Sequence, residues 1–171
     1  LAYKMGMNEL AEKFFRFFLN NSPGPVEALP NLASALRELN RLDDAVDLLR
    51  DAIGVNPTNV QLWNALGTVV NAQGDMHNAV IFYEEGLRHD PRHVHARYNL
   101  GNAKASVGRV KEGLEDLLAA LPLFTDPLNI HTCKLSIAFC YLHLGHYEEG
   151  WEWYAARDKD KASGTLYTKL F

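Results

Sequence analysis

The stretch LWNALGTVVNAQGDMHNAVIFYEEGLRHDP, residues 62–91, decides the fold because it encodes two short amphipathic helices joined by a turn. Apolar residues recur at spacings of three and four on both sides of Gly74, which is the pattern of a helix with one buried face. Gly67 lies inside the first helix, where glycine costs about 1 kcal/mol relative to alanine. We therefore expect that Gly67 allows the backbone of a neighbouring helix to approach closely.

This pattern returns along the chain with a period of 34 residues, and it resumes once more after three added residues. Small residues recur at the helix crossings, and glycine or asparagine recurs at the turn. They are Ala33, Asn40, Ala45 and Ala52; Gly67, Gly74, Ala79 and Gly86; Gly101, Gly108, Gly113 and Ala120; and Ala138, Gly145 and Gly150. We expect the turn glycines to adopt a left-handed conformation and the other small residues to let helices cross closely.

The periodicity predicts helices and no strands. The expected helices span residues 7–20, 26–39, 42–54, 60–72, 76–88, 94–106, 110–121, 130–143 and 147–158. Asn56-Pro57 and Asp90-Pro91 should end two of them, because proline cannot continue a helix.

These residues resemble the tetratricopeptide repeat (TPR) family, whose unit places W-x2-L-G-x2-Y in its first helix. Trp63, Leu66 and Gly67 match this motif, and Val70 replaces the usual tyrosine. YNLGNAKASVG, residues 98–108, is also close to the family pattern. The resemblance implies an all-α fold, a right-handed α-solenoid of stacked antiparallel helix pairs whose first helices line a concave face.

The repeat frame divides the chain into units. It predicts a partial N-terminal TPR consisting of a second helix (1–25), three full repeats (26–59, 60–93 and 94–127), a divergent repeat with a short insertion (128–161), and a C-terminal capping segment or start of a further repeat (162–171). Both ends fall inside a repeat in this frame. We therefore expect the chain to belong to a longer protein, with more repeats or a second domain beyond Phe171.

Composition and charge exclude several classes of protein. With 47% hydrophobic and 22% charged residues, the chain should be folded and soluble, and its net charge of −4 gives no broad reason to bind nucleic acid or an anionic bilayer. No apolar run reaches the roughly 18 residues of a membrane span. Cys133 and Cys140 would lie about 10.5 Å apart on one helix, too far for a disulfide, so we expect reduced thiols and a cytoplasmic protein.

The resemblance also implies that the concave face binds a segment of another protein. The expected contact residues are Asn31, Ser34, Asn64, Thr68, Asn71, Tyr98, Asn99, Asn102, Leu135, Phe139 and Leu142. Their asparagines look like the asparagine ladder of O-linked N-acetylglucosamine transferases, although asparagine is also common at these consensus positions. The three apolar residues form either a pocket for a partner's side chain or a stripe covered by the chain's own C-terminal segment.

The sequence gives little support for metal binding or catalysis. His89, His93 and His95 should not converge on a metal ion, and no residues resemble a nucleophile with its base or a phosphate-binding loop, so we expect no cofactor and no catalysis. Arg97 and Lys104 occupy positions that are usually aromatic. Either their stems cover the core while their charges reach water, or this basic edge binds an anionic partner.

A second resemblance concerns LGHYEEGWEWYAAR, residues 144–157. It is similar to the last repeat of bacterial TPR proteins that continue into a glycosyltransferase-like domain, with matches at Gly150, Trp151, Tyr154 and Arg157. The alternative function is therefore a non-catalytic arm that positions substrates for such an enzyme. We expect Trp151 and Trp153 to seal the end of the array, and self-association through exposed terminal repeats is a further possibility.

Overall fold

The computed structural model describes residues 7–21 and 26–159, and these residues form nine α-helices, two short 3-10 helices and no strand. The elements are α1 (Asn8–Asn21), η2 (Val26–Ala28), α2 (Leu29–Glu38), α3 (Leu42–Val55), α4 (Val60–Ala72), α5 (Met76–His89), α6 (Val94–Ser106), α7 (Val110–Ala120), η3 (Leu121–Leu123), α8 (Pro127–His143) and α9 (Tyr147–Lys159). Every predicted helix is confirmed, with ends within three residues of those expected. The predicted segment 162–171 lies outside the described residues.

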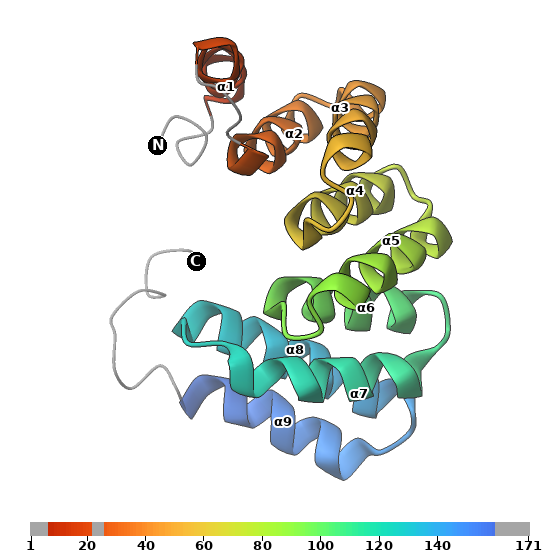
Figure 1. Ribbon diagram of the computed structural model, residues 1–171. Coiled ribbons are helices and arrows are strands. Elements are labelled where there is room, and N and C mark those ends of the chain that lie inside the picture. The colour runs from red at the N-terminus through yellow and green to blue at the C-terminus, as the bar shows by residue number, and fades with distance from the viewer. Residues whose placement is uncertain (1–6, 22–25, 160–171) are drawn as a thin grey trace. The chain divides into compact units, whose positions relative to one another are not determined.

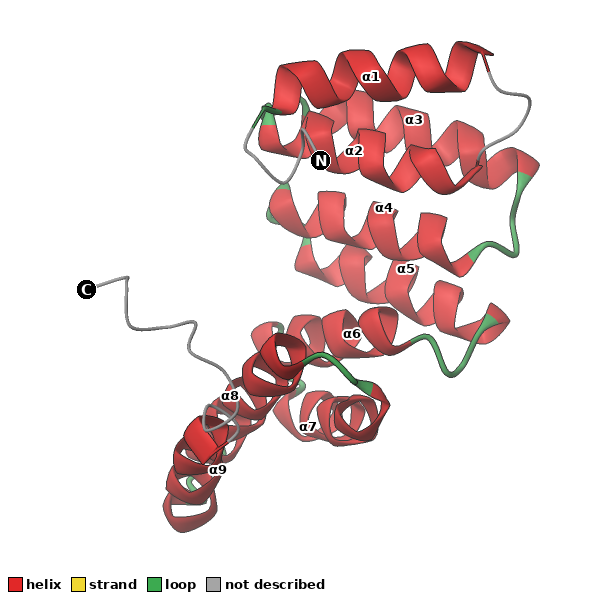
Figure 2. Cartoon of the chain, turned by 90° about the vertical axis from the view of Figure 1, so that its left-hand side faces the viewer, coloured by secondary structure: helices red, strands yellow, loops and turns green. Residues whose placement is uncertain are grey.

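The chain divides into two compact units, residues 1–99 (unit 1) and 100–171 (unit 2). In unit 1 the described helices α1 to α5 stack one after another in alternating directions (Figure 2). Leu32, Leu36, Leu49, Leu62 and Leu66 are fully buried between them. Each helix therefore presents one apolar face to its neighbours, as the sequence pattern indicates.

Close helix crossings explain two glycines of unit 1, Gly67 and Gly86. A Cβ on Gly67 would lie 2.5 Å from Cε1 of Tyr83, and one on Gly86 would lie 3.0 Å from Cβ of Trp63. The missing side chain at Gly67 thus makes room for a buried aromatic ring. The expectation of backbone proximity at this glycine is wrong, because the ring stands between the two helices.

In unit 2 the described helices α7, α8 and α9 pack in sequence (Figure 1). Here the predicted backbone approach is found between α6 and α7. A Cβ on Gly101 would lie 2.8 Å from the carbonyl oxygen of Gly113, and a Cβ on Gly113 would lie 2.5 Å from the carbonyl oxygen of Gly101. The last helix pair is also tight, because a Cβ on Gly150 would lie 2.6 Å from Cδ2 of Leu142.

The turn prediction is confirmed. Gly74, Gly108 and Gly145 have φ values of 90°, 88° and 82°, and Asn40 takes the same place with a φ of 57°. These left-handed conformations reverse the chain between the helices of a pair, and glycine or asparagine adopts them at least cost.

Helix α8 begins earlier than expected. It starts at Pro127 instead of residue 130, because Oδ2 of Asp126 accepts a hydrogen bond of 2.9 Å from the backbone N–H of Asn129. An aspartate cap followed by proline at the first helical position is a favourable helix start. The added residues before this repeat therefore extend its first helix by one turn.

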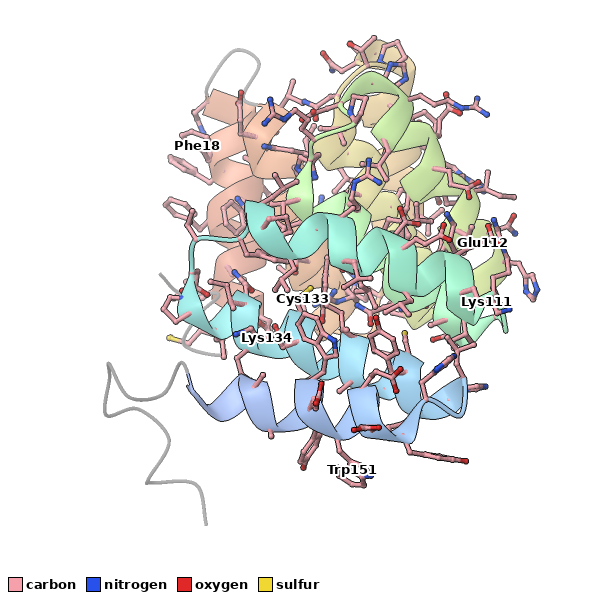
Figure 3. The ribbon with its side chains drawn as sticks, turned by 90° about the horizontal axis from the view of Figure 1, so that it is seen from below. Phe18, Lys111, Glu112, Cys133, Lys134 and Trp151 are labelled. Carbon is pink, nitrogen blue, oxygen red and sulfur yellow. The ribbon has the colours of Figure 1, made fainter. Side chains whose placement is uncertain are left out.

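Both cysteines are free and buried, as predicted. Sγ of Cys133 donates a hydrogen bond of 3.5 Å to the carbonyl of Leu117, and burial raises the pKa of this thiol to about 12. Burial also raises the pKa of Cys140. Figure 3 shows Cys133 among the helices of unit 2. Among the described helices, none is both long enough and apolar enough to cross a membrane.

Candidate functional site

A groove of about 340 Å³ runs across unit 1 between α2, α4 and the start of α6. We call it the polar groove. It is lined by Pro30, Asn31, Ser34, Arg37, Gln61, Asn64, Ala65, Thr68, Val69, His93 and His95. Four of the predicted contact residues, Asn31, Ser34, Asn64 and Thr68, lie on this surface.

Two predicted asparagines form a hydrogen-bonded pair at the groove. Nδ2 of Asn99, on α6, donates a bond of 2.9 Å to Oδ1 of Asn64, on α4. This bond links successive first helices and orients the Asn64 amide. A side-chain amide carries two N–H donors and a carbonyl acceptor, so the pair keeps capacity to bond a ligand.

Thr68 connects the groove to the core of unit 1. Its Oγ1 donates a bond of 2.9 Å to the carbonyl of Asn64 and accepts one of 3.3 Å from the hydroxyl of Tyr83. Burial raises the pKa of Tyr83, so this hydroxyl stays neutral at pH 7. Thr68 is therefore held in place by α4 and α5 together.

The groove carries little net charge. Nη2 of Arg37 lies 2.6 Å from Oε1 of Glu38, so the guanidinium is already paired. Burial is the main cause that lowers the pKa of His93, whose Nδ1 accepts a bond of 3.1 Å from the backbone N–H of Ala96. A neutral His93 thus caps α6. Amides and hydroxyls, rather than ions, dominate the groove surface.

The histidines do not form a metal centre. The rings of His93 and His95 lie 6.3 Å apart, whereas His89 faces Glu85 at 3.8 Å on α5. In the described part of the chain, no group of three histidine, cysteine, aspartate or glutamate residues could hold an ion.

The remaining predicted contact residues lie elsewhere. Asn71 is exposed near the end of α4 and Tyr98 is half-buried on α6, and neither lines the polar groove. His93 lines the groove but was not predicted as a contact residue. It precedes α6 instead of lying on a first helix, so a count of helix positions passes over it.

A second surface lies within unit 2. A hollow of about 330 Å³, here the unit 2 hollow, is lined by Asn102, Ala105, Ser106, Val110, Ser136, Phe139, Cys140 and His143. The Phe139 side chain is 56% exposed. Of the three residues of the predicted apolar stripe, only Phe139 lines this hollow, and Leu142 packs against Gly150.

The basic residues of the third repeat are largely matched by acceptors. Nζ of Lys104 lies 2.7 Å from Oδ2 of Asp116, and both side chains are only 12% exposed. Arg97 donates a bond of 2.7 Å to the carbonyl of Pro91. The expectation that the Lys104 charge reaches water is wrong, because Asp116 pairs with it between α6 and α7.

The comparison of sequences gives one family and several relatives. Residues 31–88 match the tetratricopeptide repeat family. The chain is 40% identical over 157 residues to protein FlbA of Caulobacter vibrioides, a match that covers 92% of this chain and 26% of FlbA. It is 36% identical over 78 residues to the peroxisomal targeting signal receptor of Kluyveromyces lactis, covering 46% of this chain and 14% of the receptor. The chain thus spans about a quarter of FlbA and less of the receptor.

Solved structures share the fold. A thermophilic TPR protein of Thermus thermophilus superposes with a TM-score of 0.79 at 21% identity, covering 94% of this chain and 87% of the other. MamA of Desulfovibrio magneticus superposes with a TM-score of 0.76 at 18% identity, covering 96% and 92%. At such identities the likeness concerns the fold alone, and it confirms the predicted class, an all-α solenoid of stacked helix pairs.

Proposed function

Because the chain is a tetratricopeptide-repeat protein, we propose that it is a non-catalytic scaffold whose polar groove binds an extended segment of a partner protein. The observation that carries the proposal is the hydrogen-bonded pair Asn64 and Asn99 beside a groove lined by consecutive first helices.

The chemistry of the groove suits a peptide backbone. An extended segment presents N–H and C=O groups in alternation, and each must keep a hydrogen-bond partner when it leaves water. The side-chain amides of Asn31, Gln61 and Asn64 can both donate and accept. They therefore hold the backbone with little regard to the partner's side chains.

The distribution of charge supports a neutral stretch of partner. Arg37 is paired with Glu38, and His93 is uncharged at neutral pH. A charged partner segment would lose hydration in the groove without gaining a counter-ion, which is unfavourable. The groove thus favours polar and small residues over acidic or basic ones.

The unit 2 hollow supplies a different contact. Phe139 offers an exposed ring, and serine, asparagine and histidine side chains surround it. An aromatic or aliphatic side chain of the partner would pack on this ring. Packing of this kind often contributes the few strong contacts of an interface.

The relatives are in keeping with a receptor of this kind. The Kluyveromyces lactis protein that matches 78 residues of this chain is named as a receptor for a targeting signal.

We keep the repeat boundaries at 26–59, 60–93, 94–127 and 128–161 as part of the proposal. Free thiols at Cys133 and Cys140 suit a reducing compartment such as the cytoplasm.

The test uses selected peptides. A library of random 12-residue peptides is panned against the full chain, and the dissociation constant of the best binder is measured by fluorescence polarisation. Asn64→Ala should weaken binding about 10-fold, because it removes one or two hydrogen bonds and frees Asn99. The matched control is Asn20→Ala, the same change at an exposed position on α1.

Two results would contradict the proposal. One is a library that yields no binder, and the other is a binder whose affinity is the same for Asn64→Ala and Asn20→Ala. Circular dichroism of each variant separates loss of binding from loss of fold.

A further inference from the structure

Helix α1 has an apolar side that faces solvent. Met7, just before the helix, and Leu10, Phe14 and Phe17 are 46%, 48%, 59% and 68% exposed, and Phe18 is 40% exposed. Figure 3 shows Phe18 projecting from α1. Large apolar side chains gathered on one helix usually mark an interaction surface.

The repeat frame does not account for Leu10 and Phe17 on this side of α1, although Phe14 and Phe18 fall on positions that are apolar or buried in the later second helices. Steps of 34 residues carry Leu10 and Phe17 onto positions that are mostly polar or charged in the later second helices. They are Asp44, Asn78 and Glu112 for Leu10, and Asp51, Glu85 and Ala119 for Phe17. A position that is solvated in the other repeats is thus apolar in α1.

The spacing of these residues indicates a helix as the partner. Met7, Leu10, Phe14 and Phe17 follow one another at intervals of three, four and three, the spacing of the seam between two packed helices. The ring of Phe18 stacks on that of Phe14, with centroids 6.4 Å apart. The exposed face is therefore a preformed ridge two heptads long.

The charges of one α1 helix complement those of a second copy packed in the opposite direction. Glu9 lies in the first turn of α1 and Lys13 one turn later, and both are exposed. Glu12, by contrast, already pairs within the chain with Arg16 at 2.9 Å and with Arg41 at 2.8 Å. Two copies of α1 packed antiparallel bring Glu9 of each beside Lys13 of the other, whereas parallel packing sets like charges together.

The exposed area is sufficient for a weak dimer. The five apolar side chains expose on the order of 500 Å² in one copy. A two-fold contact uses the same surface twice, so about 1,000 Å² would be buried, the lower limit for a specific interface.

We propose that α1 is a docking surface for α1 of a second copy of this chain, packed antiparallel about a two-fold axis. This surface lies on α1, whereas the polar groove is built from α2, α4 and the start of α6, so dimerisation leaves the groove to the partner peptide. The dimer and the peptide-binding function are independent proposals.

Sedimentation velocity of the full chain tests the dimer directly. We expect a monomer at about 1 µM and a dimer at about 200 µM, since a contact near the minimum area gives weak affinity. Phe14→Glu together with Phe17→Glu should leave a monomer at both concentrations. Trp151→Glu, a matched change of an exposed aromatic residue on α9, should dimerise like the wild type.

A disulfide trap tests the antiparallel arrangement. In that arrangement Leu10 of one copy faces Phe14 of the other, so a mixture of Leu10→Cys and Phe14→Cys chains should form the mixed disulfide on oxidation. Parallel packing would instead join each variant to itself. Cys133 and Cys140 are buried and should not interfere.

Three outcomes would overturn the proposal. They are a wild-type chain that is monomeric at 200 µM, a dimer lost in Trp151→Glu but kept in the α1 variant, and a trap that yields no mixed disulfide. A monomer whose α1 variant no longer sediments with anionic lipid vesicles would instead assign this face to a membrane surface.

Discussion

The two units solve the same packing problem in different ways. In unit 1 the crossing at Gly67 is filled by the ring of Tyr83, whereas in unit 2 the crossing of Gly101 and Gly113 brings two backbones together. A side-chain ring can turn about its own torsion angles, whereas two helical backbones move only as whole elements. The same pattern of small residues therefore corresponds to two contacts of different rigidity.

The surfaces of the two units also differ in chemistry. The polar groove of unit 1 is rich in amides, and the unit 2 hollow centres on an exposed Phe139. Turn glycines and helix-crossing residues recur in both units, so the frame of the repeat does not decide what is bound. Recognition belongs to the residues that vary on top of this frame.

Gly113→Ala should lower the free energy of unfolding most. It tests the comparison between the two units directly. Its Cβ would lie 2.5 Å from the carbonyl of Gly101 and 2.9 Å from the backbone nitrogen of Ala105, so two helices must separate. We expect a loss of about 3 kcal/mol in the free energy of unfolding, against about 1 kcal/mol for Gly67→Ala. Urea denaturation measures both, and an equal or larger loss for Gly67→Ala would break the comparison.

Lys104→Met should have the second-largest effect on the free energy of unfolding. It removes the ammonium group that lies 2.7 Å from the largely buried carboxylate of Asp116, and we expect a loss of about 2 kcal/mol. Lys111→Met is the matched control, because Lys111 is exposed on the same helix pair and should change stability by less than about 0.5 kcal/mol. Equal urea midpoints for the two variants would show that the pair contributes nothing.

Raising the pH should destabilise the chain through Cys133, a residue of unit 2. The unfolded thiol titrates near 8.5, and the folded one near 12. Below pH 8.5 both states hold the proton. Above it the unfolded state loses the proton first, so the stability from the protonated thiol is progressively lost up to pH 12.

The expected loss from this group is about 1 kcal/mol between pH 8.5 and 9.5. Urea denaturation at the two values measures it, and Cys133→Ala should flatten the slope even though the variant is less stable. A slope that the substitution leaves unchanged would assign the pH dependence to other groups.

Gly54→Ala should have the smallest effect and the opposite sign. Nothing lies within 4 Å of a Cβ at this position in α3, so alanine adds helix propensity without a clash. We expect a gain of up to about 1 kcal/mol, measured as a higher urea midpoint. A loss of stability here would show that tight packing extends to glycines outside the helix crossings.

The sequence was sufficient for the helices and their turns, because period, proline and turn glycine are local signals. The cap at Asp126 was missed because it lies inside the inserted residues. The pairing of Lys104 with Asp116 joins residues from different helices, and no local pattern reveals which carboxylate a lysine will meet. Contacts between elements depend on their crossing geometry, which a periodic pattern leaves open.

In the candidate site, too, the sequence predicted residues but not the contacts between them. Repeat positions pointed to both Asn64 and Asn99, but not to the bond between them. Of the two tryptophans expected to seal the end of the array, Trp151 is 59% exposed and points outward from α9 (Figure 3), whereas Trp153 is half-buried. The side chain of Arg157, which the glycosyltransferase-like resemblance includes, lies outside the described residues.

The most direct test of the central claim is a nuclear magnetic resonance titration of the isotope-labelled full chain with a library-selected peptide. If the polar groove binds peptide backbone, the side-chain amide signals of Asn64 and Asn99 should shift with the peptide concentration and saturate together. Saturating shifts confined to residues outside the groove, with both amides unmoved, would contradict the account.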